Sequence, residues 1–165
     1  MDFYQGVVLD YLRADRAVFV NAQCCIQLNK KANPDTSGPH WYCDAVVLDL
    51  RNKTVFLCEI SYAAKLGALL DRLNQWSQSW QGIHAALIRD CEVPAKWPVR
   101  PWLFVPEESI ELLVAKVETM KSVDGLAVFT PRITPLQAVQ PWRYHSWNHR
   151  DENTEKLNVP EAMRF

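Results

Sequence analysis

The segment 41–61 constrains the fold most strongly, because it contains two apolar runs joined by a short polar turn. The runs 41–50 and 54–61 are rich in the β-branched and aromatic residues that favour strands. Only Arg51, Asn52 and Lys53 separate them, and runs joined so closely usually pair as a β-hairpin. The sequence therefore predicts two adjacent antiparallel strands over 41–61.

Each of these two predicted strands carries one acid among apolar residues, Asp44 in the first and Glu59 in the second. Strict alternation of side chains would place Asp44 on the same face as Tyr42 and Val46, and Glu59 on the same face as Leu57. A carboxylate in apolar surroundings is costly unless something compensates its charge. A divalent cation is a good compensator, since Mg²⁺ is satisfied by few carboxylates together with carbonyls and water. We therefore expect the two acids to converge on one metal ion.

The rest of the chain alternates between helical and strand-like patterns, which predicts an α/β domain with a mixed central sheet flanked by helices. We expect one domain over 1–140 and an aromatic and polar C-terminal arm over 141–165, with the last fifteen or so residues loosely ordered. The predicted helices are 3–14, a long amphipathic one from 63 to about 89, and one from 106 to about 121. The further strand-like runs are 17–20, 24–28, 102–105 and 126–129.

Composition and charge narrow the function classes. The net charge of −1 argues against a protein that simply coats nucleic acid, so any phosphate binding has to be local. The five cysteines are an odd number and lie mostly inside apolar runs, which favours free thiols in a reducing compartment. The N-terminus lacks the basic start of a signal peptide, and no apolar run approaches the roughly 20 residues of a membrane span. We expect a cytoplasmic protein that does not enter a membrane.

The order helix, strand, Asp-bearing strand, Glu-bearing strand, long helix, strand resembles the PD-(D/E)xK, or restriction-endonuclease-like, nuclease superfamily. The segment WYCDAVVLDLRNKTVFLCEIS at 41–61 carries the resemblance, and the wider match covers roughly 1–106. It implies an αβββαβ core with a C-terminal helix–strand extension. In that family two acids bind the metal, and a lysine two residues after the second acid activates water.

Taken residue by residue, the resemblance implies that Asp44 and Glu59 bind Mg²⁺ or Mn²⁺, with the backbone carbonyl of Ile60 as a further ligand. Two positions depart from the family pattern, since Cys43 replaces the usual proline and Ser61 stands where the catalytic lysine is expected. Ser61 can only hydrogen-bond a water, and Lys65, about one helical turn further on, is the replacement candidate. The implied function is a divalent-metal-dependent nuclease-like protein that acts on DNA phosphodiesters, with DNA favoured over RNA as the nucleic-acid partner.

Other interpretations of the same residues remain open. Asp44 can be an exposed hairpin residue, Glu59 can pair with a cation of the following helix such as Arg72, and Lys65 can be a solvated charge. Ser61 at the lysine position favours a second hypothesis, a catalytically inactive nuclease fold that binds DNA. A third is an assembly subunit of a bacterial or phage system, with a protein partner or a second copy of itself.

Several polar and aromatic residues are secondary candidates. Asp10, Gln75 and Gln78 resemble acids and glutamines that some family members carry in these helices, although exposed helix residues are the commoner case. The aromatic and basic residues of the arm can stack on bases and bind phosphate, or they can pack over the core. Possible nucleic-acid contacts are Lys30, Lys31, Trp142, Arg143, Tyr144 and Arg150.

Overall fold

A mixed five-stranded sheet with strand order β1-β2-β3-β4-β5 organises the protein. The computed structural model describes residues 2–29, 38–120, 129–144 and 159–163. Strands β1, β2 and β3 form an antiparallel meander, while β4 and β5 run parallel to β3. The strands are β1 (Val18–Gln27), β2 (His40–Asp49), β3 (Thr54–Ile60), β4 (Val99–Val105) and β5 (Arg132–Pro135). The helices are α1 (Phe3–Ala14), α2 (Gly67–Gln78), α3 (Trp80–Cys91) and α4 (Ile110–Glu118), with 3₁₀ turns η1 (Glu107–Ser109), η2 (Leu136–Val139) and η4 (Glu161–Met163).

The predicted hairpin is confirmed, and so is the α/β class with its mixed sheet. β2 and β3 pair in antiparallel register from Asp49–Thr54 to Ala45–Cys58. The two strand-like runs at 17–20 and 24–28 belong to one continuous strand, β1.

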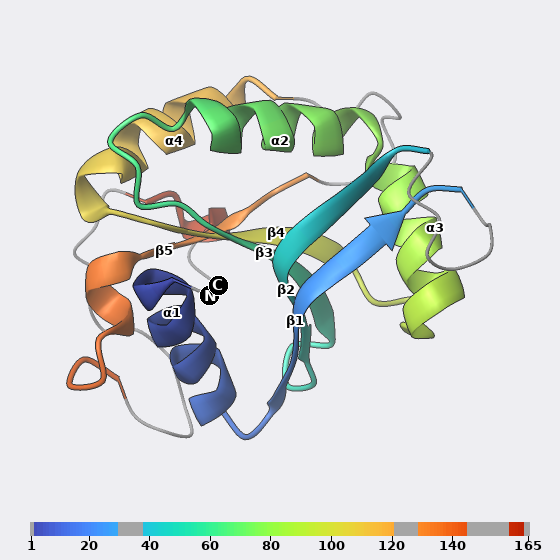
Figure 1. The fold of residues 1–165 in the computed structure, drawn as a ribbon, viewed down its shortest axis with the longest axis horizontal. Helices are drawn as coiled ribbons and strands as arrows, with labels where there is room; N and C mark the ends of the chain where they lie inside the picture. Colours follow the sequence, from blue (N-terminus) through green and yellow to red (C-terminus); the bar gives the residue numbers. More distant parts are fainter. Residues whose placement is uncertain (1, 30–37, 121–128, 145–158, 164–165) are drawn as a thin grey trace.

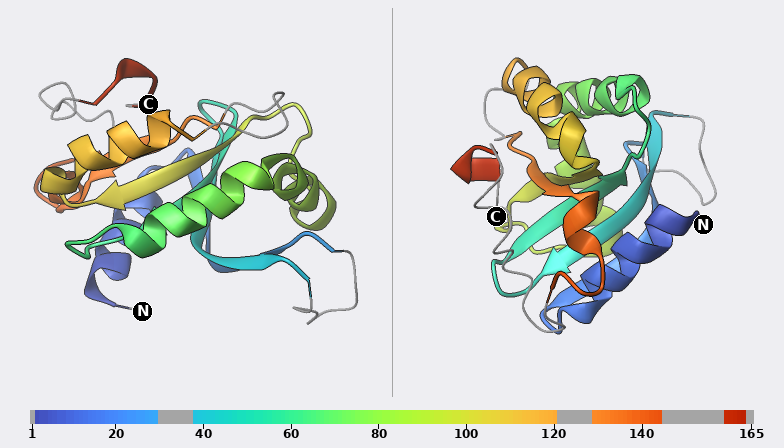
Figure 2. Two further views of the ribbon diagram at one scale, coloured as in Figure 1. Left: turned by 90° about the horizontal axis from the view of Figure 1, so that it is seen from above. Right: turned by 90° about the vertical axis from the view of Figure 1, so that its left-hand side faces the viewer.

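Helices cover both faces of the sheet (Figures 1 and 2). The face covered by α2, α3 and α4, here called the α2 face, buries the larger apolar cluster, which includes Leu57 and Leu103 of the central strands. The opposite face, here called the α1 face, lies against α1 and η2 and buries a second cluster around Phe56, Trp102 and Phe104. The sheet is thus the middle layer of three, the usual way for both of its faces to escape water.

The prediction of one long helix over 63–89 is wrong, because helix begins only at Gly67 and the segment forms two helices that meet at Ser79. The amide of Ser79 donates to the carbonyl of Trp76, and the carbonyl of Ser79 accepts the amide of Ile83. Ser79 thus ends α2 and begins α3. Trp76 and Trp80 are both buried on the α2 face, so the apolar spacing continues across the break.

The C-terminal part also differs from expectation. β5 occupies 132–135, whereas the strand predicted over 126–129 falls mostly on residues outside those described. The helix predicted from 106 begins with the 3₁₀ turn η1 and ends at Glu118. Val159 and Met163 are buried in the α2-face cluster, so this part of the predicted arm packs on the core rather than being loosely ordered.

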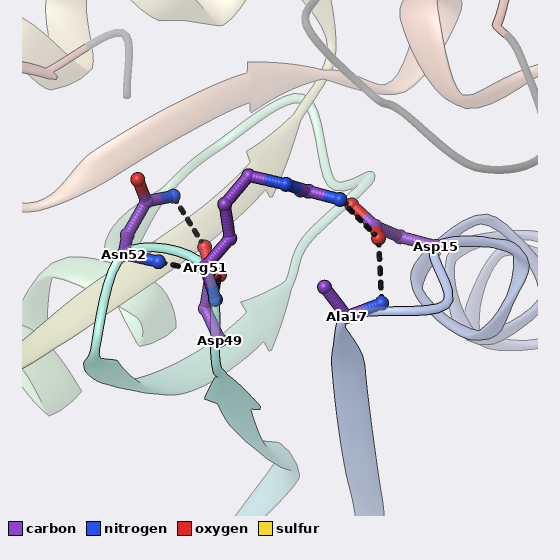
Figure 3. A network of polar contacts seen from close by, with 5 residues as sticks. All are labelled: Asp15, Ala17, Asp49, Arg51 and Asn52. Carbon is purple, nitrogen blue, oxygen red and sulfur yellow. Dashed lines mark hydrogen bonds and ion pairs between the residues drawn. The ribbon is translucent and has the colours of Figure 1, made fainter.

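A polar network fixes α1 to the turn between β2 and β3 (Figure 3). The carboxylate of Asp49 accepts the backbone amides of Arg51 and Asn52 and so closes the turn. The guanidinium of Arg51 donates twice to Asp15 at the end of α1, at 2.9 and 3.0 Å, and Asp15 also accepts the amide of Ala17. The hairpin turn and the first helix therefore hold each other in place on the α1 face.

β1 reverses its two faces at Gln23. Val18, Val20 and Ala22 pack on the α1 face, whereas Cys24, Ile26 and Leu28 pack on the α2 face. Gln23 has a φ of 54°, in the left-handed region that costs an ordinary residue roughly 1–2 kcal/mol. It lies opposite Asp44 at the one level where the pairing of β1 with β2 is interrupted.

Candidate functional site

Asp44 lies where β2 also reverses its faces, since Cys43 packs on the α2 face and Ala45 on the α1 face. The strict alternation expected from Tyr42 to Val46 therefore fails at this residue. The carboxylate of Asp44 accepts two hydrogen bonds, from the backbone amide of Ile60 at 2.8 Å and from the side-chain amide of Gln5 at 2.6 Å. Asp44 thus links β3 and α1 just beyond the end of the β2–β3 ladder.

Glu59 is buried on the other side of the same point, next to the last β2–β3 pair and on the α2 face. Nη1 of Arg72 in α2 donates to the Glu59 carboxylate at 2.8 Å. The same nitrogen donates to the carbonyl of Tyr42 at 2.7 Å. Arg72 therefore bridges β2 and β3 where their backbones stop pairing, and the alternative of a Glu59–Arg72 ion pair is observed.

The two carboxylates share one nearby cation. Burial raises the pKa of Glu59 to about 8, although Arg72 lowers it, and the charge of Asp44 raises it further. Burial also raises the pKa of Asp44, against the opposing effects of Ile60, Gln5 and Arg72. When both acids are ionised, two negative charges in a poorly solvated place are opposed, among the described residues, by the one positive charge of Arg72. This excess of negative charge favours an added cation or bound protons.

The oxygen donors at this point are of the kind that a hard cation binds. They are too few to complete its coordination. The described residues contain no group of three or more His, Cys, Asp and Glu side chains that would hold a metal. Two carboxylates and a backbone carbonyl need waters to complete the coordination, which is usual for Mg²⁺. Because Gln5 reaches Asp44 from the α1 face and Arg72 reaches Glu59 from the α2 face, a shared ion would have to displace or reorient these partners.

The structure places Ser61, Ile60 and Lys65, the other residues predicted for the site, in three different surroundings. Ser61 continues the sheet, its amide donating to the carbonyl of Phe104 at 2.9 Å, and its side chain is half-buried. Ile60, the predicted carbonyl ligand, packs its side chain on the α1 face. Lys65 is exposed and precedes α2, so it belongs to the connection and not to the helix in which it was expected.

Gln5 is the residue at this site that sequence reasoning missed. It occupies the third position of α1, where it forms a capping box with Asp2. The capping pattern at residues 2–5 is a signal for the helix start, but not for the contact with Asp44. Among the secondary candidates in the helices, Asp10 and Gln78 are exposed, and Gln75 accepts a hydrogen bond from the indole of Trp41.

The predicted nucleic-acid contacts divide into three groups. Lys30, Lys31 and Arg150 lie outside the described residues. Tyr144 packs edge-on against Tyr11 with ring centroids 4.9 Å apart, so it follows the packing alternative and contributes to the α1-face core. Trp142 and Arg143 are exposed and border a pocket.

This pocket has a volume of about 380 Å³ and opens beyond the carboxyl ends of the parallel strands β3, β4 and β5. Ligands of open α/β sheets are commonly bound outside the carboxyl ends of the strands. Tyr62 follows β3, Pro106 follows β4, and Tyr4 comes from the first turn of α1. The lining residues are Tyr4, Tyr62, Pro106, Glu108, Leu136, Gln137, Gln140, Trp142 and Arg143.

Comparison of the chain with protein-family models, with curated proteins and with solved structures found no match. In the described part of the chain, no helix has the length and apolar character that a membrane span requires.

Proposed function

We propose that the protein is a divalent-metal-dependent nuclease-like protein that acts on the phosphodiesters of DNA, built on a restriction-endonuclease-like core. One observation carries the proposal. Two carboxylates, Asp44 and Glu59, lie on adjacent strands at the end of their ladder, in a poorly solvated place where the guanidinium of Arg72 pairs with Glu59. The order of α1, three antiparallel strands, α2–α3 and a parallel β4 supports the αβββαβ core.

Asp44, Glu59 and the carbonyl of Ile60 would hold the metal, and their oxygen donors suit Mg²⁺ or Mn²⁺. A bound ion of this kind lowers the pKa of an attacking water and stabilises charge on the phosphoryl group. Arg72 would then be free to leave Glu59 and bind a DNA phosphate through charge-assisted hydrogen bonds. Ser61 can hydrogen-bond the attacking water, and the exposed Lys65 is the proposed source of the missing positive charge beside it.

Replacing Asp44 with asparagine is expected to lower the rate of DNA cleavage at least a hundredfold, because the amide removes one of the two carboxylate ligands. The measurement is cleavage of plasmid and of single-stranded DNA by the purified protein with Mg²⁺ or Mn²⁺. Asp71→Asn is the matched control, since Asp71 is an exposed acid on α2. Equal cleavage by wild type and Asp44→Asn, or none by wild type, would refute the proposed activity.

Binding of Mn²⁺ is expected to strengthen about tenfold per pH unit as the pH rises from 6 towards 8. The metal has to displace a proton from Glu59, whose pKa burial raises to about 8, so the proton competes below that pH and not above it. Isothermal titration calorimetry at three pH values measures this dependence, and Glu59→Gln should remove both the affinity and the slope. An affinity for Mn²⁺ that does not change between pH 6 and 8 would contradict the assignment.

A second candidate function is a DNA-binding or assembly subunit on the same fold without catalysis. Two observations favour it: Arg72 already neutralises Glu59, and Ser61 stands at the position of the family lysine. Such a subunit would bind DNA, a protein partner or a second copy of itself without turnover. Light scattering, together with DNA titration with and without Mg²⁺, separates this candidate from the nuclease.

We further propose a cytoplasmic location for either function. All five cysteines are free, in agreement with the sequence prediction. Cys43 and Cys58 are buried in the sheet, where burial raises their pKa and disfavours the reactive thiolate.

A further inference from the structure

Three exposed aromatic side chains line the pocket, and a fourth lies beside one of them. Tyr4 and Tyr62 are stacked with ring centroids 4.8 Å apart, and Phe3 contacts the edge of Tyr4. Trp142, which also lines the pocket, is 78% exposed. Large aromatic side chains gathered at a hollow, instead of buried in the core, are typical of a binding surface.

Polar side chains also line the same pocket. The side-chain oxygen of Gln137 accepts the backbone amide of Glu107 at 2.9 Å, which fixes its orientation. Its amide nitrogen lies 3.5 Å from the carboxylate of Glu108. Glu108 supplies acceptors and Gln137 a donor, the groups that recognise the hydrogen-bonding edge of a base. Arg143 adds the positive charge that a phosphate needs.

Two of the pocket residues lie close in sequence to residues of the carboxylate site. Tyr62 follows Glu59 by three residues at the end of β3. Tyr4 precedes Gln5, which donates to Asp44 at 2.6 Å. Tyr4 is therefore the neighbour of Gln5 on α1, and Tyr62 lies two residues past the end of β3, the strand that carries Glu59.

We propose that this pocket binds one unstacked base of single-stranded DNA, stacked on the aromatic residues, with Arg143 on an adjacent phosphate. A volume of about 380 Å³ lies at the lower end of the range for small-molecule pockets, about 300–1,000 Å³, and suits one nucleotide. Bases within a duplex stay stacked and paired and cannot enter such a pocket without being extruded. That the strand continues towards Asp44 and Glu59 rests on the proposed nuclease function, whereas the base pocket itself does not.

Fluorescence anisotropy with a labelled single-stranded 12-mer of mixed sequence tests the pocket. EDTA is present, so that neither metal binding nor cleavage contributes. Tyr62→Ala and Trp142→Ala are each expected to weaken binding about tenfold, the usual scale for losing one stacking partner. Phe19→Ala is the matched control, because Phe19 is an exposed aromatic residue on the distant edge strand β1 and its loss should leave binding unchanged.

The outcomes separate this inference from the proposed function. If the wild type and Asp44→Asn bind the strand equally but neither cleaves DNA with Mn²⁺, the nuclease proposal fails and the base pocket stands. If Tyr62→Ala and Trp142→Ala bind as tightly as Phe19→Ala, or if a duplex of the same sequence binds as tightly as the single strand, the base pocket is refuted. Absence of binding by the wild type refutes it as well.

Discussion

Replacing Arg72 with alanine is expected to lower the free energy of unfolding by about 3 kcal/mol at pH 9, where Glu59, whose pKa is raised to about 8, is ionised. The change leaves Glu59 buried without its cation, and it removes the donor to the carbonyl of Tyr42. Breaking a buried ion pair by removing one partner usually costs about 3–5 kcal/mol. We place this pair at the low end of that range, because the side chain of Arg72 is 34% exposed and water can partly replace it.

Urea denaturation measures this loss, and two comparisons test its cause. In the double variant Arg72→Ala with Glu59→Gln, most of the stability should return, because a neutral amide is cheaper to bury than a carboxylate. Millimolar Mn²⁺ should stabilise Arg72→Ala more than the wild type, because the metal no longer competes with the guanidinium. A loss below 0.5 kcal/mol, or no recovery in the double variant, would show that Arg72 does not balance the charge of Glu59.

Replacing Trp102 with alanine is expected to cost about 4 kcal/mol, the largest effect we predict for a single residue. Trp102 is buried at the centre of the α1 face, with the rings of Phe56 and Phe104 at 5.0 and 5.1 Å. The guanidinium of Arg132 lies 3.9 Å from the centroid of its ring, and its indole donates to the hydroxyl of Thr134 at 2.9 Å. Truncation removes all of these contacts and leaves a cavity between the sheet and α1.

Trp142→Ala makes the same chemical change at an exposed position and is the natural control. Its effect on the free energy of unfolding should stay within about 0.5 kcal/mol, as for other surface substitutions. Chemical denaturation of both variants under identical conditions gives the comparison. If the two variants lose equal stability, the assignment of Trp102 to the core and of Trp142 to the surface is contradicted.

The central hairpin could be predicted because its signals are local. Two apolar runs separated by three polar residues specify the pairing of β2 with β3, and this pairing brings Asp44 beside Glu59. Arg72 was foreseen as an alternative partner of Glu59, since it lies on the helix that follows β3. Gln5 was not foreseen, because 39 residues separate it from Asp44 and no pattern in the sequence joins them.

Two features of the fold had no signal in the hydrophobic pattern. The break at Ser79 leaves the three- and four-residue spacing of buried residues intact, and Ser79 is neither glycine nor proline, the residues that usually mark an interruption. In β1, Val20, Ala22, Cys24 and Ile26 alternate without a gap, so the alternation gives no sign of a change of face. The structure divides these residues between two faces, because one residue adopts a positive φ.

Because β1 changes faces at Gln23, the two ends of the β1–β2 hairpin tolerate different substitutions. At one end, Val20 and Ala22 have to suit the surface of α1; at the other, Cys24 and Ile26 have to suit the helices of the α2 face. Repacking at one end therefore need not propagate to the other, and each can diverge with the helices that it contacts. Position 23 is the constrained one, where glycine, asparagine and aspartate are tolerated and a β-branched residue would be selected against.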